Sequence, residues 1–352
     1  HTLLEGFSIL FTAIIIGVIA NILIYKTLRE LKFGERLSIL VTAGTFLSSY
    51  VVWYIFLLPS FTHIYEYFSV VLAFWGIVKF LNSKKYRYSI FAGLGVSLAV
   101  LIRPTNIIIA ALFLLLFVIN AVKQKKVNYL LTFILSSIPC AVILIIYNSQ
   151  TSYSSVVNAN NFILSDFNGL NVLFSLQRGW FIYSPLFFFG TIGLLMLLKK
   201  SRMLSLIGLG SIVGIVTIYG FFAEWWGGGS YGARYMISLA PIVAIGVAYF
   251  IAQVNKSKNK LKYFINLIII LCVVFSTIIL LLYRITPVGK LRPAIDSVGI
   301  MYSANRYTPF DMISYHINLL KTSASIKDYF GNLYKSVDGG SGFLIILLGI
   351  SN

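Results

Sequence analysis

Ten long apolar segments, spread over the whole chain, constrain this sequence more than any other feature. A helix needs roughly 20 mostly apolar residues to cross a bilayer. Only 11% of the residues are charged, whereas soluble domains carry about 25%. We therefore predict an all-α fold, a polytopic transmembrane helical bundle with about 10–11 spans. The ten segments lie at 7–25, 38–58, 64–81, 88–102, 106–122, 128–147, 181–198, 203–222, 236–253 and 263–283.

The loops between these segments alternate in charge. Every second loop is short and basic, and these loops hold 18 of the 28 Lys and Arg residues. Basic loops of membrane proteins usually face the cytoplasm. We therefore expect a multi-pass protein of the plasma or inner membrane, with any active site on the extracytoplasmic face. The net charge of +18 fits contact with anionic membrane lipid, so we expect no nucleic-acid partner.

The chain divides into three parts on the basis of composition. We expect a transmembrane bundle over 1–283 and an outer-face cap or loop over 284–340. An apolar run within 341–352 is too short to cross a bilayer, and we expect it to be the start of a further, truncated span. Cys140 and Cys272 lie inside apolar runs, and their spacing fits no metal site.

Two short polar motifs fall at the expected outer ends of spans. His63 and Glu66 are three residues apart at the start of a helix, so they share one face. They are candidates for acid–base catalysis or for half of a metal site, or they are an ordinary interfacial pair. Arg103, followed by Pro104, lies between two spans. Its fork of donors suits a phosphate, although an Arg at this place can also extend to lipid headgroups.

A glycine-rich loop over 222–235 is the third candidate region. It contains four glycines between 227 and 232, and glycine lets a backbone approach a ligand closely. Glu224 and Arg234 bracket the loop, and ionisable groups at the edge of a bilayer are costly unless paired or used. Trp225 and Trp226 either anchor the chain at the membrane interface or stack on a sugar or lipid.

A fourth motif closes the long loop before the segment at 181–198. It contains Arg178, which contacts phosphate or anchors the chain at the interface. The spans contain almost no charged residues in their interiors, which argues against a proton-coupled transporter.

The four motifs, in this order, resemble those of the bacterial membrane glycosyltransferases of the GT-C superfamily. Relatives of these enzymes include the protein O-mannosyltransferases and the lipid A aminoarabinose transferases. The motifs are Pro-Ser-x-x-His (59–63), Leu-Ile-Arg-Pro-Thr-Asn (101–106), Arg-Gly-x-Phe-x-Tyr-Ser-Pro (178–185) and Trp-Trp-Gly-Gly-x-Ser-x-Gly-x-Arg (225–234). The resemblance covers the chain from about residue 40 to 250.

The resemblance implies transfer of a sugar from a polyprenyl-phosphate donor to a glycan, lipid or protein acceptor, next to membrane lipid. It implies that Arg103, Arg178 and Arg234 bind the donor phosphate, and that His63 assists. The residues expected to shape the substrate site are Asn106, Trp225, Trp226, Gly227, Gly228, Ser230 and Tyr231.

The family's catalytic base is an acidic residue in the first outer loop, and this sequence has no matching residue there. We expect the base to lie upstream of His1; otherwise Glu66 or Glu224 replaces it, or the protein is inactive. Some relatives use a divalent metal ion; His63, Glu66 and Glu224 are the available ligands here, and we assign neither a metal site nor a cofactor. The alternative functions are a lipid-linked glycan flippase, ligase or polymerase, and a non-enzymatic transporter or subunit.

Overall fold

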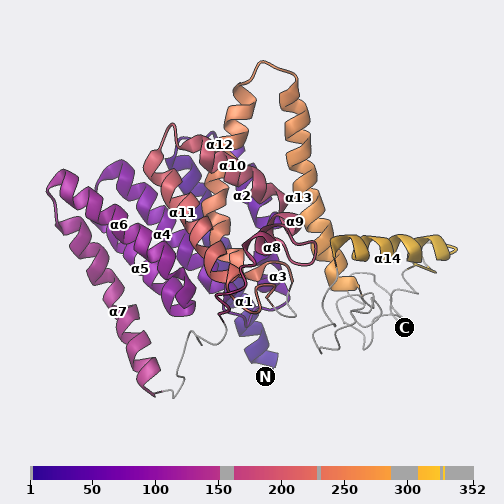
Figure 1. Ribbon diagram of the computed structural model, residues 1–352, viewed down its shortest axis with the longest axis horizontal. Helices are drawn as coiled ribbons and strands as arrows, with labels where there is room; N and C mark the ends of the chain where they lie inside the picture. Colours follow the sequence, from indigo (N-terminus) through magenta and orange to yellow (C-terminus); the bar gives the residue numbers. More distant parts are fainter. Residues whose placement is uncertain (1–2, 151–161, 228–230, 287–307, 326–327, 330–352) are drawn as a thin grey trace.

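The computed structural model describes residues 3–150, 162–227, 231–286, 308–325 and 328–329, and these residues form a helical bundle (Figure 1). Among these described residues, seven helices are long and apolar enough to cross a membrane, and two further apolar helices, Arg87–Ile102 and Pro185–Leu197, are shorter. The all-α, polytopic prediction is therefore confirmed. The helices are α1 (Leu3–Glu30), α2 (Glu35–Ser48), α3 (Val51–Phe56), α4 (His63–Ser83), α5 (Arg87–Ile102), α6 (Ile107–Gln124), α7 (Asn128–Gln150), α8 (Gly169–Phe174), α9 (Trp180–Tyr183), α10 (Pro185–Leu197), α11 (Arg202–Gly220), α12 (Ala240–Lys256), α13 (Leu261–Ile285) and α14 (Pro309–Thr322), with short 3₁₀ helices η1 (Pro104–Asn106) and η3 (Arg234–Leu239).

The segment expected to form one helix over 38–58 is divided into α2 and α3, so that detail of the prediction is wrong. The hydroxyl of Ser49 donates a hydrogen bond to the carbonyl oxygen of Phe46 at 2.8 Å, and Ser49 has extended backbone angles. Such local bonds compete with helix continuation. Tyr50 fills the break and is 1% exposed.

Small residues let three pairs of helices pack with their backbones in contact. A Cβ atom at Gly76 of α4 would lie 2.6 Å from the backbone nitrogen of Ala92 in α5. Between α10 and α12, a side chain at Gly193 would overlap the carbonyl group of Gly246. A third contact of this kind brings Gly93 of α5 against the backbone of α7. Close packing of this kind is typical of helices within membranes.

The basic loops all lie at one end of the bundle, which we call the basic end; the opposite end is the site end. Lys32, Lys84 and Lys125 follow α1, α4 and α6 with left-handed backbone angles (φ between 51° and 66°). A positive charge there also favours the helix C-terminus. At the same end, the turn between α12 and α13 projects beyond the other helices (Figure 1).

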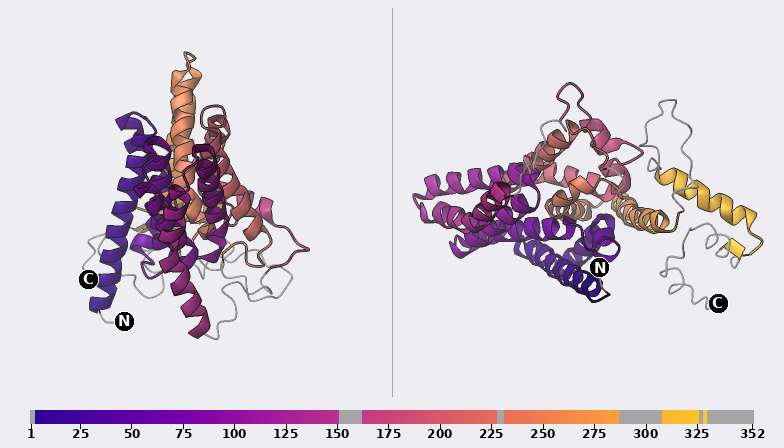
Figure 2. Two further views of the ribbon diagram at one scale, coloured as in Figure 1. Left: turned by 90° about the vertical axis from the view of Figure 1, so that its left-hand side faces the viewer. Right: turned by 90° about the horizontal axis from the view of Figure 1, so that it is seen from below.

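Of the expected outer segment 284–340, the structure describes residues 284–286, 308–325 and 328–329, and the helix among them is α14. It lies across the site end of α13 and extends away from the bundle (Figures 1 and 2). His316 joins the two helices, because its Nε2 lies 2.9 Å from Oγ1 of Thr286. The expected truncated span over 341–352 lies outside the described residues.

Candidate active site

The candidate site is built around a buried carboxylate in the first two turns of α4. Glu66 is 0% exposed and His63 is 1% exposed. Their side chains point the same way, with 3.7 Å between Nδ1 of His63 and Oε2 of Glu66, as their spacing predicted. The rings of Tyr54 and Phe61 flank His63 at 4.1 and 6.1 Å between ring centroids. This pair is therefore enclosed by protein.

Arg103 bridges both members of the pair from the end of α5. Its Nε lies 3.3 Å from Oε2 of Glu66, and its Nη2 lies 3.1 Å from Nδ1 of His63. Because a guanidinium can only donate, Nδ1 of His63 must accept, so the proton of the neutral imidazole is on Nε2. Burial lowers the pKa of Arg103, but the Glu66 carboxylate together with Tyr219 and Tyr235 raises it above the ordinary value.

Asn106 fixes the other oxygen of Glu66. Its Nδ2 donates to Oε1 of Glu66 at 2.9 Å and to the carbonyl oxygen of Ala99 at 3.1 Å. Asn106 ends the short helix η1, whose first residue, Pro104, begins a new helix after the extended Arg103. We predicted Asn106 as a substrate-binding residue; the structure turns its amide inward and places it in support of Glu66.

Arg234 reaches the same place from the start of η3. Its guanidinium lies 5.1 Å from the ring centroid of Tyr235, and the guanidinium of Arg103 lies 5.4 Å from that centroid. Two cations thus share one aromatic ring, which can stabilise each of them. Among the described residues, Glu66 pairs with Arg103 and no carboxylate lies within ion-pair distance of Arg234, so the positive charge of Arg234 is in excess here.

Two donor groups of this cluster are unused. Within the described part of the chain, Nη1 of Arg103 and Nε of Arg234 are buried and have no hydrogen-bond partner. An unpaired buried donor is unfavourable, and a phosphate oxygen would satisfy it. The arrangement can therefore bind an anion.

Two tyrosines in the site had no role in our sequence-based predictions. Tyr235 stacks on Tyr219 with 4.2 Å between centroids and 1° between ring planes. The hydroxyl of Tyr219 lies 2.9 Å from Oγ1 of Thr105. This stack connects the η1 region to α11 and η3. The position of Tyr235 next to Arg234 was the only signal for it in the sequence.

Arg178 lies among a second group of aromatic rings. It is 2% exposed, and its Nη1 donates to the hydroxyl of Tyr183 at 3.3 Å. Its guanidinium also lies 5.6 Å from the ring centroid of Tyr283. Although burial lowers the pKa of Arg178, the neighbouring Tyr183 and Tyr283 raise it above the ordinary value. That Arg178 binds phosphate stays a prediction.

The glycine-rich loop packs against both aromatic groups. Gly227 has φ +81°, and a Cβ atom there would lie 3.1 Å from Cγ of Arg234. Tyr231 is 2% exposed and stacks on Trp53, with 5.4 Å between centroids. Tyr231 is therefore part of the aromatic core in this structure, although we predicted it as a substrate contact.

The remaining predicted residues of the loop are more open. Glu224 is exposed, and Trp225 and Trp226 are half-buried with perpendicular rings 5.9 Å apart. Gly228 and Ser230 lie outside the described residues.

We assign no metal site in the described part of the chain. Among the residues that the structure describes, no group of three or more His, Cys, Asp or Glu side chains could hold a metal ion. His63 and Glu66 are close together, but the oxygens of Glu66 already face Arg103 and Asn106.

Comparison with known proteins connects this site to a family. No curated protein and no solved structure matches the chain significantly. Residues 3–146, which are 144 of the 352, match the family described as dolichyl-phosphate-mannose-protein mannosyltransferase. The matched part includes His63, Glu66, Arg103 and Asn106. Over these residues the chain is similar to the dolichyl-phosphate-mannose-protein mannosyltransferases, which confirms its resemblance to the GT-C superfamily of membrane glycosyltransferases.

Proposed function

We propose that this membrane glycosyltransferase transfers a sugar from a polyprenyl-phosphate donor to a glycan, lipid or protein hydroxyl on the extracytoplasmic face. The observation that carries the proposal is the pair of guanidinium groups over the ring of Tyr235. Each of them keeps a buried N–H group without a partner among the described residues. Two such donors, with an excess of positive charge, suit a phosphate.

The reaction that we propose is a displacement at the anomeric carbon. The acceptor oxygen forms a bond to that carbon, and the bond from the carbon to the phosphate oxygen breaks. The electron pair leaves with the polyprenyl phosphate, where Arg103 and Arg234 stabilise the developing negative charge. The proton of the acceptor hydroxyl passes to a carboxylate, and we expect inversion at the anomeric carbon.

The two candidate carboxylates, Glu66 and Glu224, have different environments. Glu66 is enclosed and holds Arg103 and Asn106, so we assign it, together with His63, to positioning the guanidinium. Glu224 is exposed and is the one that an acceptor can reach. We therefore propose Glu224 as the candidate base within the described residues; the expected base upstream of His1 stays an expectation.

Arg178 has a different role in this proposal. Its guanidinium can reach a phosphate only by leaving Tyr183 and Tyr283, since it is 2% exposed. We assign it to holding the loop before α9 against α13. The half-buried Trp225 and Trp226 are placed at the edge of the site, where we propose that they contact the sugar or the prenyl chain.

The proposal is tested by measuring transfer of labelled sugar from a polyprenyl-phosphate donor by the purified full chain in nanodiscs. We expect Arg103→Ala and Arg234→Ala each to lower kcat/KM by about 10²-fold, as loss of one transition-state donor does. Arg87→Ala is the matched control, because Arg87 is exposed at the basic end. Unchanged transfer by the Arg103→Ala/Arg234→Ala double variant would overturn the proposal.

A further inference from the structure

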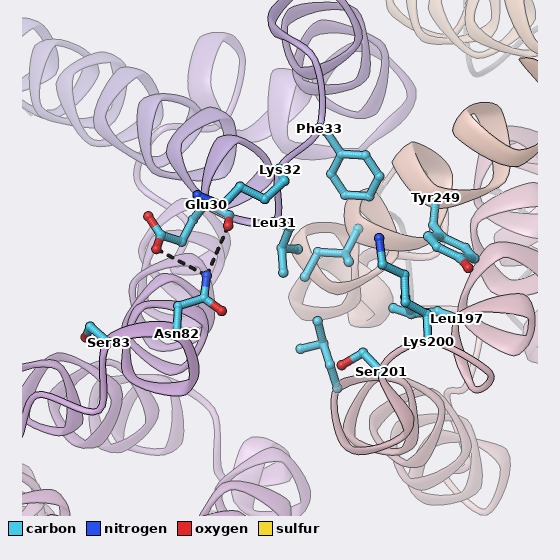
Figure 3. A pocket seen from close by; sticks show the side chains of 12 residues that line it. Glu30, Leu31, Lys32, Phe33, Asn82, Ser83, Leu197, Lys200, Ser201 and Tyr249 are labelled. Carbon is cyan, nitrogen blue, oxygen red and sulfur yellow. Dashed lines mark hydrogen bonds between the residues drawn. The ribbon is translucent and has the colours of Figure 1, made fainter. Parts of the chain in front are cut away.

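A cavity of about 540 Å³ lies at the basic end of the bundle, at the opposite end of α4 from Glu66. Figure 3 shows its lining side chains. They come from four places that are distant in sequence: the turn between α1 and α2, the end of α4, the turn between α10 and α11, and α12. Since Glu66 and Asn82 are 16 residues apart on α4, about 24 Å separate the cavity from the candidate active site.

The single acidic residue in the lining is already neutralised. Oε2 of Glu30 lies 2.5 Å from Nζ of Lys79. Nδ2 of Asn82 donates to Oε1 of Glu30 at 3.1 Å and to its carbonyl oxygen at 3.0 Å (Figure 3). Glu30 is thus held on its own side of the cavity by partners on α4.

Two further lysines line the cavity, and the charge of one of them, Lys32, also acts on Glu30. Within the described residues, neither Lys32 nor Lys200 forms an ion pair. Lys200 lies on the same side of the cavity as Tyr249, with its ammonium 5.9 Å from the centroid of that ring (Figure 3). Lys32 lies on the opposite wall with φ 66°. These two cations, from opposite walls, give the cavity a positive potential.

The rest of the lining is amphipathic. Ser201 supplies a hydroxyl group, whereas the hydroxyl of Ser83 already donates to the carbonyl oxygen of Lys79 at 2.7 Å. Leu204, Ile245 and Leu197 form a buried apolar floor. An anionic group joined to an apolar chain would match both the cationic side chains and the apolar floor of this lining. The helices that form the walls, α1, α4 and α10, end here, so the cavity lies at the level where headgroups meet water.

We propose that this cavity is a phosphate-binding site, with Lys32 and Lys200 contacting the phosphate from opposite sides and the hydroxyl of Ser201 donating to it. The phosphate can belong to a membrane phospholipid or to a free phosphate ion. The volume lies in the range of about 300–1,000 Å³ that is typical of small-molecule sites, which favours a headgroup over the smaller free ion. This site is independent of sugar transfer.

Native mass spectrometry of the purified full chain tests the proposal, with dioctanoyl phosphatidylglycerol, dioctanoyl phosphatidylcholine and inorganic phosphate as separate probes. We expect the phosphatidylglycerol to bind at least tenfold more tightly than the phosphatidylcholine. The Lys32→Gln/Lys200→Gln variant should lose this preference. The matched control is Lys258→Gln/Lys260→Gln, which removes two exposed lysines from the α12–α13 turn at the same end and should keep it.

The other outcomes are also decisive. Binding of inorganic phosphate that depends on Lys32 and Lys200, without a preference for phosphatidylglycerol, would support the site and identify the free ion as its ligand. Equal loss of binding in the control variant would attribute the effect to general surface charge and overturn the proposal. The proposal would also be overturned if phosphatidylglycerol and inorganic phosphate each bound the Lys32→Gln/Lys200→Gln variant as tightly as the unsubstituted chain.

Discussion

At the scale of single residues, Glu66 organises the site end by accepting from two directions. Its Oε2 faces Arg103 and its Oε1 accepts from Asn106. A buried carboxylate needs such partners, because removing its charge from water is costly. The orientation of Arg103, and thus of its unused donor, depends on this carboxylate.

We predict that Glu66→Gln destabilises the protein by about 3 kcal/mol, the lower part of the range for breaking a buried ion pair. The new amide would direct a donor at Arg103, or withdraw the acceptor from Asn106. Denaturation midpoints in detergent measure the loss, with Glu35→Gln as the control because Glu35 is exposed at the start of α2. A midpoint equal to that of the control would contradict the role assigned to Glu66.

The sequence predicted some of these residue contacts and not others. His63 and Glu66 were placed on one face by helix periodicity, which is a local property. Residue types and motif order also identified Arg103 and Arg234 as candidate phosphate ligands. The stack of Tyr219 on Tyr235, and the bond from Tyr219 to Thr105 across 114 positions, depend on how distant helices pack. The spacing of residues in the sequence does not reveal how distant helices pack. The inward turn of Asn106 was missed for the same reason.

At the scale of helices, close backbone contacts define the bundle. The contact between α10 and α12 places Gly190, Gly193 and Gly246 against one another. Apolar periodicity predicted most helices, but it did not predict the division between α2 and α3, because the hydroxyl of Ser49 bonds locally in a segment that is otherwise apolar.

We predict that Gly246→Ala destabilises the protein by about 1–3 kcal/mol, as overpacking does. The added methyl group would overlap the carbonyl group of Gly190, so α10 and α12 must separate. Thermal unfolding in detergent measures this. Gly34→Ala is the control, since a Cβ atom there has nothing within 4 Å. Equal melting temperatures for both variants would show that α10 and α12 can accommodate the added methyl group without a loss of stability.

The contact of α14 with α13 should depend on pH through His316. The hydroxyl of Thr286 donates to the carbonyl oxygen of Leu282 at 2.6 Å, so it accepts from Nε2–H of His316. Nδ1 then accepts from the hydroxyl of Tyr329 at 2.9 Å. This arrangement requires a neutral ring, and burial lowers the pKa of His316 below its ordinary value.

Because the folded pKa is below the unfolded value of about 6.5, the neutral ring stabilises the contact fully above that pH. The stabilisation is lost as the pH falls from about 6.5 through the folded pKa. Hydrogen–deuterium exchange of α14, corrected for intrinsic rates, should therefore show less protection at about pH 5 than at pH 7.5. His316→Gln should remove this difference; if the variant keeps it, another group is responsible.

At the scale of the whole molecule, the two ends of the bundle differ in chemistry. The basic end carries the lysines that follow α1, α4 and α6. The site end carries the polar cluster around Glu66 and the glycine-rich loop. Alternation of loop charge predicted this separation from the sequence, because it depends on the number and order of spans and not on their packing.

We predict that the site end faces outward in cells. In a variant with Cys140 and Cys272 changed to Ser, an impermeant maleimide added to intact cells should label Glu224→Cys. It should label Lys258→Cys only after the membrane is opened, because Lys258 is exposed in a turn at the basic end. The reverse pattern would place sugar transfer on the cytoplasmic side and contradict the proposed function.

The helix α4 contributes Glu66 near its first residue and Asn82 near its last, and it therefore acts as a spacer between two distant compartments. At Gly76 its backbone is in contact with the backbone of α5, and this close packing opposes movement of one helix along the other. Because α4 cannot shift along its own axis, a change at one end of the helix should not move the residues at its other end. Occupancy of the lysine-lined cavity should thus leave the affinity for a sugar donor unchanged, and any adjustment during turnover should come from the connecting segments at the substrate's own end.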